Sequence, residues 1–152
     1  MEIRALTDAD VEPLAAGLAA LPLLRRYGRG ADRIAADLRA ARARGEGLLV
    51  SAGPGGPGGL AWFLPAGTLA LGGYLRLLAV APGAQGSGAG AALLAAFEEE
   101  VARSSRHAFL LVSDFNAEAQ RFYERRGWTR VGALPGLVLP DVAELLYWKR
   151  LR

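Results

Sequence analysis

The chain has 152 residues, and its content of 52% hydrophobic and 22% charged residues is typical of a globular protein and excludes an intrinsically disordered one. It has no cysteine, which excludes disulfides, thiolate metal sites and a cysteine nucleophile. One histidine cannot form a histidine metal cluster, so we expect no metal site. The net charge of +3 is compatible with an anionic ligand but is too small to indicate nucleic acid.

We expect residues 1–152 to form a single domain, because the length suits one sizeable core and no repeat or linker divides the chain. No apolar run reaches 18 residues, and the N-terminal MEIRALTDAD is acidic, unlike a signal peptide. These features predict a cytoplasmic protein with no membrane partner. Exposed apolar residues on the last strands are compatible with a monomer or a homodimer.

The first part of the chain predicts a strand over residues 2–6 and a helix that begins at Thr7. Thr7 offers an N-cap, and Asp10 lies three residues later as the acidic partner of a capping-box-like arrangement. Apolar residues then follow at helical spacing until Pro22 interrupts them: Val11, Leu14, Leu18 and Leu21.

Residues 23–30 predict a polar and aromatic connection to a second helix over residues 31–43, which Gly45 ends. The glycine- and proline-rich residues 53–59 predict a flexible hairpin turn, and residues 65–73 predict another turn. The segments that predict strands around these turns are 47–52, 60–64 and 75–80.

The stretch from Leu75 to Glu100 predicts a buried strand, a glycine-rich loop and a helix that begins near Ala89. The loop between them reads Gln85-Gly86-Ser87-Gly88-Ala89-Gly90. Glycines let backbone N–H groups approach a ligand closely, and the helix that follows adds the positive end of its dipole. The stretch therefore predicts an anion site, most often one for phosphate.

The last third of the chain predicts a strand, a helix ended by Gly127, and two further strands. These four segments are 109–113, 116–126, 128–134 and 144–151, and a loop over 135–141 separates the last two strands. The expected order of elements is β-α-α-β-β-β-α-β-α-β-β, an α/β (α+β) arrangement.

Two common phosphate loops fit the glycine-rich stretch poorly. A Walker loop requires a Gly-Lys-Ser/Thr ending, and this loop has no lysine. A dinucleotide fingerprint requires Gly-x-Gly-x-x-Gly after a first strand and an acidic residue about 20 residues later. Here the glycines alternate, the loop lies in mid-chain, and the nearest downstream acids fall within the helix.

The loop, with Val80-Ala81-Pro82 before it and Leu93-Leu94 after it, resembles the acetyl-CoA pyrophosphate loop of the GNAT family of N-acetyltransferases, Gln/Arg-x-x-Gly-x-Gly/Ala. A second block is also similar to that family: Asn116, Ala119, Phe122-Tyr123 and Gly127-Trp128. The resemblance covers nearly the whole chain. It implies the GNAT acyl-CoA N-acyltransferase fold, with a mixed central sheet splayed at the acetyl-CoA site.

The resemblance also implies how acetyl-CoA would bind. Backbone groups of the strand before the loop would pair with the pantetheine arm, and an N–H of that strand would face the thioester carbonyl. Asn116 would hold the arm, and Arg126 is a candidate for the 3′-phosphate. The cofactor-binding residues implied are Leu78, Ala79, Val80, Gln85, Gly86, Ser87, Gly88, Ala89, Gly90, Asn116, Ala119, Phe122, Tyr123 and Arg126. Independently of the resemblance, Asn116, Ala119 and Tyr123 are spaced to share one helix face.

The reaction implied is attack of a primary amine on the acetyl thioester, with Tyr123 as the acid that protonates the departing thiolate. Relatives carry a glutamate base where this chain has Tyr74 or Leu111. The nearest carboxylate, Asp114, is a candidate base, but we expect it to cap the next helix instead. A water chain through Tyr74 or backbone carbonyls is the remaining route for the proton, so no base is identified. The absence of a base leaves an alternative function, a non-catalytic acyl-CoA-binding module.

The acceptor, a small molecule or a peptide amine, is expected to lie among the first helices, the central strands and the 135–141 loop. Arg25 is a candidate for selecting an anionic group on the acceptor. The full set of candidate substrate residues is Arg25, Tyr27, Trp62, Tyr74 and Arg76.

Overall fold

The computed structural model describes residues 1–152, and its elements follow the predicted order with one short helix added after the first. The helices are α1 (Asp8–Leu18), α2 (Pro22–Arg26), α3 (Ala31–Ala43), α4 (Ala89–Ala102) and α5 (Ala117–Glu124), and η1 (Pro82–Ala84) is a single 3₁₀ turn. The strands are β1 (Glu2–Ala5), β2 (Gly47–Gly53), β3 (Gly56–Thr68), β4 (Gly72–Val80), β5 (His107–Ser113), β6 (Thr129–Pro135) and β7 (Ala143–Arg150). The short helix α2 lies mostly within the segment predicted as a connection; α1 already ends at Leu18, and Pro22 occupies the first position of α2, where a proline favours a helix start.

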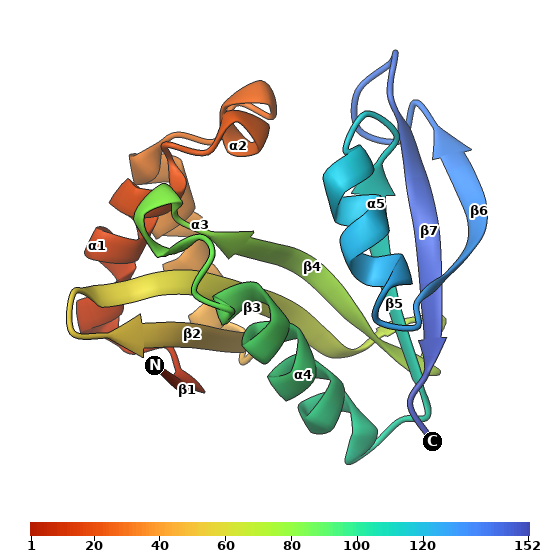
Figure 1. Cartoon of the computed structure of the whole chain (residues 1–152), viewed down its shortest axis with the longest axis horizontal. Coiled ribbons are helices and arrows are strands. Elements are labelled where there is room, and N and C mark those ends of the chain that lie inside the picture. Colours follow the sequence, from red (N-terminus) through yellow and green to blue (C-terminus); the bar gives the residue numbers. More distant parts are fainter.

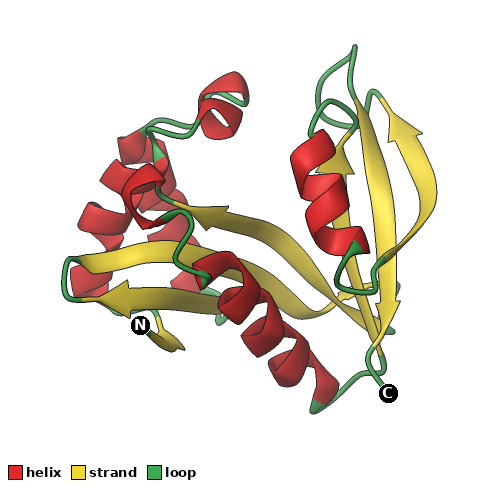
Figure 2. Ribbon diagram, viewed as in Figure 1, coloured by secondary structure: helices red, strands yellow, loops and turns green.

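The seven strands form one sheet in the order β1-β2-β3-β4-β5-β7-β6 (Figures 1 and 2). Every neighbouring pair is antiparallel except β4 and β5, which are parallel and are joined through α4. In Figure 1, β4 and β5 start close together and then diverge toward their C-terminal ends. The mixed, splayed sheet confirms the predicted fold.

Two apolar clusters pack on opposite faces of the sheet. The first joins α1, α2 and α3 to the sheet, and the second joins α4 and α5 to the other face. Alternation along β3 shows this division, because Trp62 belongs to the first cluster whereas its neighbours Ala61 and Phe63 belong to the second. The sheet therefore has helices on both faces.

The first hairpin differs from its prediction. The turn expected over 53–59 is confined to Pro54 and Gly55, and β3 begins at Gly56, whose φ of 97° suits the reversal. Glycine further along β3 serves packing: a Cβ on Gly59 would lie 2.8 Å from Ser51 Oγ and 2.9 Å from a Leu93 methyl carbon. The packing of α4 therefore leaves no room for a side chain at position 59, and a glycine is required there within the strand.

The turn expected over 65–73 is also shorter than predicted. The strand β3 continues to Thr68, and β4 already begins at Gly72, so only residues 69–71 remain for the reversal. Leu69 and Ala70 take positive φ angles of 54° and 56° in this tight turn.

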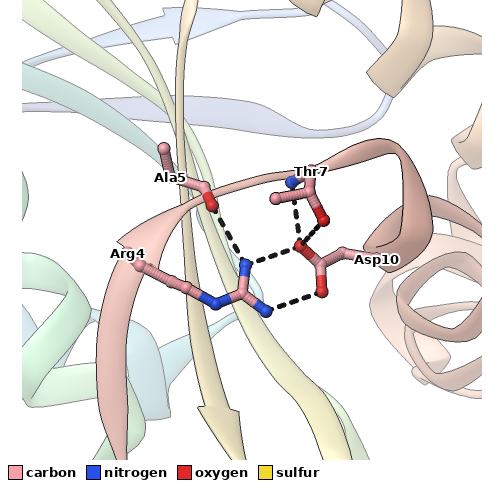
Figure 3. A network of polar contacts seen from close by, with 4 residues as sticks. All are labelled: Arg4, Ala5, Thr7 and Asp10. Atoms are coloured by element: carbon pink, nitrogen blue, oxygen red, sulfur yellow. Dashed lines mark hydrogen bonds and ion pairs between the residues drawn. The ribbon is translucent and has the colours of Figure 1, made fainter.

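The start of α1 follows its prediction. Asp10 accepts hydrogen bonds from the Thr7 N–H at 2.8 Å and the Thr7 hydroxyl at 2.7 Å (Figure 3). Arg4, from β1, adds a bidentate ion pair at 2.6 and 2.8 Å. These bonds lower the pKa of the Asp10 carboxyl well below its usual range, Arg4 being the main cause. The network joins the first strand to the first helix.

None of the helices is both long and apolar enough to cross a membrane.

Candidate functional site

The parallel strands β4 and β5 pair only at their starts. Residues 72–75 pair with residues 107–110, and beyond Leu75 the edge of β4 that faces β5 has no strand partner. The register of β4 against β3 skips Arg76, which makes a β-bulge where the strands separate. A cleft of about 370 Å³ opens there, and its walls are mainly hydrophobic. Backbone groups of β4 are thus exposed along one side of an apolar cleft.

The glycine loop follows β4 and leads into α4. Gly86 and Gly88 have φ angles of 78° and 83°, in the left-handed region that favours glycine. The loop is held by its own side chains: Gln85 donates to the Val80 carbonyl at 3.2 Å, and the Ser87 hydroxyl donates to the Ala84 carbonyl at 2.6 Å. Several N–H groups of the loop and the first turn of α4 make no hydrogen bond within the chain: those of Gly86, Ser87, Gly88, Gly90 and Ala91. The loop therefore presents free donors at the N-terminus of a 14-residue helix.

One face of α5 lines the opposite side of the cleft with Asn116, Ala119 and Tyr123, as their spacing predicts. Asn116 is the N-cap of α5, since its Oδ1 accepts from the Ala119 N–H at 3.1 Å, and its Nδ2 group makes no hydrogen bond in the chain. The expectation that Asp114 caps this helix is wrong. Its carboxylate instead accepts from the Ala143 N–H at 3.1 Å, which ties the end of β5 to β7.

Tyr123 is 8% exposed, and burial raises the pKa of its phenol. Its hydroxyl makes no hydrogen bond within the chain, yet every fully buried side-chain polar atom has a partner. The hydroxyl oxygen must therefore reach the cleft, which Tyr123 lines. The arrangement is a protonated phenol with an unused O–H at the cleft wall.

Phe122 and Arg126, which the family resemblance predicts to bind the cofactor, lie just beyond the cleft-lining face of α5. Phe122 lies beside the start of α4, where a Cβ built on Gly90 would meet its ring at 3.8 Å. The Arg126 guanidinium stacks on the same ring at 3.8 Å and donates to the Phe122 carbonyl at 3.0 Å. Arg126 is therefore folded against its own helix, near the loop.

Four of the five candidate substrate residues line the cleft: Tyr27, Trp62, Tyr74 and Arg76. Arg76 stacks over the Trp62 ring at 4.3 Å, and the Trp62 indole N–H donates to Glu46 at 2.5 Å. Arg25 does not line the cleft; it is exposed and donates to the Ala19 carbonyl at 3.3 Å, because the turn of α2 directs it away.

Comparison with protein families finds one family model that matches the residues around the cleft. The family model described as an acetyltransferase (GNAT) domain matches residues 65–134, which contain β4, the glycine loop and α5. Residues 65–134, just under half of the chain, are therefore similar to a GNAT acetyltransferase domain. Both sequence blocks that resemble this family lie entirely within the matched residues.

Solved structures extend the likeness of the fold to the whole chain. A GNAT-family protein from Desulfovibrio desulfuricans is 23% identical, with a TM-score of 0.81 and 99% of each chain covered. An aminoglycoside 6′-N-acetyltransferase complexed with coenzyme A is 18% identical, with a TM-score of 0.81, and the match covers 100% of this chain and 98% of that one. A ribosomal-protein-alanine N-acetyltransferase from Brucella melitensis is 21% identical, with a TM-score of 0.78 and 99% of each chain covered. Comparison with curated protein sequences finds no significant match.

The cleft has one residue of note that the sequence did not predict. Glu144, at the start of β7, is buried and lines the cleft. The Tyr27 hydroxyl donates to its Oε1 at 2.6 Å, and the Ser113 hydroxyl lies 3.3 Å from both carboxylate oxygens. Tyr27 and Ser113 are themselves 2.5 Å apart. Burial is the main cause, and the bond to Glu144 the next, of the raised pKa of Tyr27.

The only sequence signal for Glu144 is an acidic residue at the start of an apolar strand, which is more often solvent-exposed. The three members of the group come from α2, β5 and β7, so their meeting depends on the pairing of Ser113 with Glu144 and on where α2 lies. No local periodicity carries that information.

Proposed function

We propose that the protein is an N-acetyltransferase that transfers the acetyl group of acetyl-CoA to a primary amine. One observation carries the proposal: the splay of β4 from β5 places unpaired strand backbone, free loop N–H groups and the Asn116–Tyr123 face around a single cleft. An elongated donor that ends in a pyrophosphate suits this combination. The similar aminoglycoside acetyltransferase was solved with coenzyme A, which supports the same donor here.

In this proposal the loop N–H groups from Gly86 to Gly90 hold the pyrophosphate, where the α4 dipole adds to their attraction. The free edge of β4 at residues 78–80 pairs with the pantetheine arm. Asn116 donates to the arm through its unused Nδ2 group. Ala119 leaves room for the arm against α5, and Phe122 and Arg126 flank the loop.

The chemistry is direct attack of the amine nitrogen on the thioester carbonyl carbon, with a backbone N–H of Leu78 or Ala79 stabilising the oxyanion. The carbon–sulfur bond breaks, and Tyr123 donates its proton to the thiolate. Burial raises the pKa of Tyr123, so its phenol is protonated at neutral pH but gives up its proton reluctantly to a thiolate, whose acid has a pKa of about 8.5. Tyr123 therefore regains at once the proton that the new amide nitrogen releases.

The proposal is tested in two steps. Titration calorimetry with acetyl-CoA and with CoA measures donor binding, and release of free thiol from acetyl-CoA measures turnover with amines, polyamines, amino acids and peptides. We expect binding of both donors and thiol release that depends on an amine. Binding without turnover on any amine would indicate a non-catalytic acyl-CoA-binding module instead, and absence of binding would exclude both functions.

A further inference from the structure

Glu144 is a buried carboxylate with no cationic partner. It is 6% exposed, and no lysine, arginine or histidine forms an ion pair with it. The other carboxylate that lines the cleft, Asp37, is paired with Arg29 and Arg33. A buried charge is costly unless it is paired. Glu144 therefore lies where a positively charged group of a ligand would complete its environment.

The hydrogen bonds that Glu144 makes leave room for such a ligand. Tyr27 and Ser113 have one hydroxyl hydrogen each, whereas a carboxylate offers about four acceptor positions. Oε2 has only the 3.3 Å contact to Ser113. At least two acceptor positions therefore remain free, while the Tyr27 bond to Oε1 holds the carboxylate in place.

Strand alternation places Glu144 on the side of the sheet opposite to the glycine loop. Leu145 and Tyr147 pack in the cluster under α4 and α5, so Glu144 points to the other face, as does its neighbour Ser113 beside the buried Val112. Tyr27 approaches from α2, on that same side. A donor held by α4 and α5 and an acceptor held by Glu144 would thus meet through the gap between β4 and β5.

Resting on the acetyl transfer proposed above, we propose that Glu144 binds the ammonium form of the acceptor and takes its proton, and that the acceptor is a monoamine flanked by an apolar group, such as the α-amine of a peptide. One N–H bond of the ammonium breaks as the carboxyl O–H forms, and the freed electron pair forms the N–C bond as the C–S bond breaks. Tyr123 gives its proton to the thiolate, and a second N–H bond breaks to return a proton to Tyr123. Glu144 then releases its proton to solvent. The ammonium and acetyl-CoA yield the acetamide, the free CoA thiol and one proton.

The charges and walls of the cleft select this class of amine. Glu144 is the only unpaired carboxylate there, and a second positive charge on the acceptor would meet Arg29 or Arg76. The remaining walls near α2 and the 135–141 loop are apolar, including Leu23, Leu24 and Val138. An α-amine also gives up its proton at a pKa of about 8, whereas a lysine side chain requires about 10.4. Polyamines and aminoglycosides suit the site less well.

The test compares two amines by titration calorimetry with the full chain and no acetyl donor: the tripeptide amide alanyl-leucyl-phenylalaninamide and spermidine. We expect the wild type to bind the peptide more tightly than spermidine. Glu144→Gln keeps the size of the side chain and removes its charge, and should weaken peptide binding by about 30-fold or more. The matched control is Glu124→Gln, whose carboxylate accepts from the Tyr147 hydroxyl at 2.8 Å outside the cleft; it should bind the peptide like the wild type.

Turnover adds a second readout. With acetyl-CoA and the peptide, Glu144→Gln should release thiol about 100-fold more slowly or worse, while its affinity for CoA stays that of the wild type. Equal peptide binding by Glu144→Gln and the wild type overturns the role of Glu144. Tighter binding of spermidine, or no binding of the peptide by the wild type, overturns the acceptor class. If the wild type binds the peptide but not CoA, acetyl transfer is wrong and the amine site stands.

Discussion

At the scale of single residues, two buried tyrosines differ in the surroundings of their hydroxyl groups. Tyr123 and Tyr147 are both buried tyrosines near the same cluster, and burial raises the pKa of each, that of Tyr147 to about 12. They differ in what the hydroxyl meets: Tyr147 donates to Glu124, whereas the Tyr123 hydroxyl faces the cleft. This difference separates a structural tyrosine from a candidate acid.

Tyr123→Phe should lower kcat for an active amine by about 100-fold, because it removes the proton donor but keeps the ring in its apolar site. Its affinity for CoA should change little, as calorimetry can show. Tyr147→Phe is the control, since its hydroxyl bond lies outside the cleft, and it should leave kcat nearly unchanged. Equal kcat for Tyr123→Phe and the wild type would remove Tyr123 as the acid.

At the scale of elements, the loop and helix that follow β4 form one unit. Gly88 is the N-cap of α4 with a φ of 83°, and a Cβ built on it meets nothing within 4 Å. The conformation is therefore required by the turn, and the space beside it is open to a ligand. The same combination occurs at Gly45, beyond the end of α3 and outside the cleft.

Gly88→Val should abolish measurable CoA binding, because the side chain occupies ligand space and the backbone leaves the positive φ region. Calorimetry with CoA checks this. Gly45→Val introduces similar backbone strain, of about 1 kcal/mol or more, and should still bind CoA like the wild type. Normal binding by Gly88→Val would show that the loop does not hold the donor.

Another element, the start of α1, makes stability depend on pH. The folded-state pKa of Asp10 is lowered below the usual value of about 3.9, so the folded state binds fewer protons than the unfolded one in that range. Its contribution to stability is fully present above about pH 4 and is lost as the pH falls through the lowered pKa. Asp10 is 5% exposed, which protects the ion pair with Arg4 from solvent screening.

Asp10→Asn should lower the free energy of unfolding by about 2 kcal/mol at pH 7, because it removes charge-assisted bonds from Arg4 and Thr7. The difference from the wild type should shrink as the pH falls below about 4, as urea unfolding at a series of pH values can measure. Asp8→Asn is the control in the same helical turn. Asp8 pairs with Arg42 in an exposed position, so its loss should cost less than about 1 kcal/mol. Equal losses at pH 7 would contradict the role given to Asp10.

At the scale of the whole molecule, the splay separates β1–β4 with α1–α3 from β5–β7 with α5, and residues at the end of α2 contact both parts. Tyr27 bonds to Ser113 and Glu144, and the Arg26 guanidinium lies 3.6 Å from the centre of the Phe115 ring. These contacts join the end of α2 to β5, to β7 and to the loop after β5. The position of α2 therefore depends on β5 and β7 as well as on the apolar cluster that it shares with α1 and α3.

Tyr27→Phe should speed amide hydrogen exchange in residues 22–30, because it removes the hydroxyl that reaches across the cleft. Exchange in the core strand β3 should stay at the wild-type rate. Hydrogen-exchange mass spectrometry measures both, and Tyr147→Phe should leave residues 22–30 unchanged. Unaltered exchange there in Tyr27→Phe would show that the hydroxyl bonds do not hold α2.

The sequence alone determined the features that depend on neighbours along the chain. The order of strands and helices, the N-terminal network of Thr7 and Asp10, and the shared face of Asn116 and Tyr123 all follow from local spacing, and the structure shows each of them. The glycine and proline content of residues 56–59 predicted a turn, but these residues form the start of β3, and at Gly59 the close packing of Leu93 from α4 excludes a side chain.

Only the tertiary structure decided which side chains meet around Glu144 in the cleft. Glu144 contacts Ser113, 31 residues away in the sequence, and Tyr27, 117 residues away. Contacts over such separations produce no periodic pattern in the sequence. A carboxylate reaches the cleft from β7 and not from the positions of Tyr74 and Leu111, through the register of β5 with β7. Local propensity sets helix faces and caps, but long-range pairing alone brings charged groups from distant segments into one cleft.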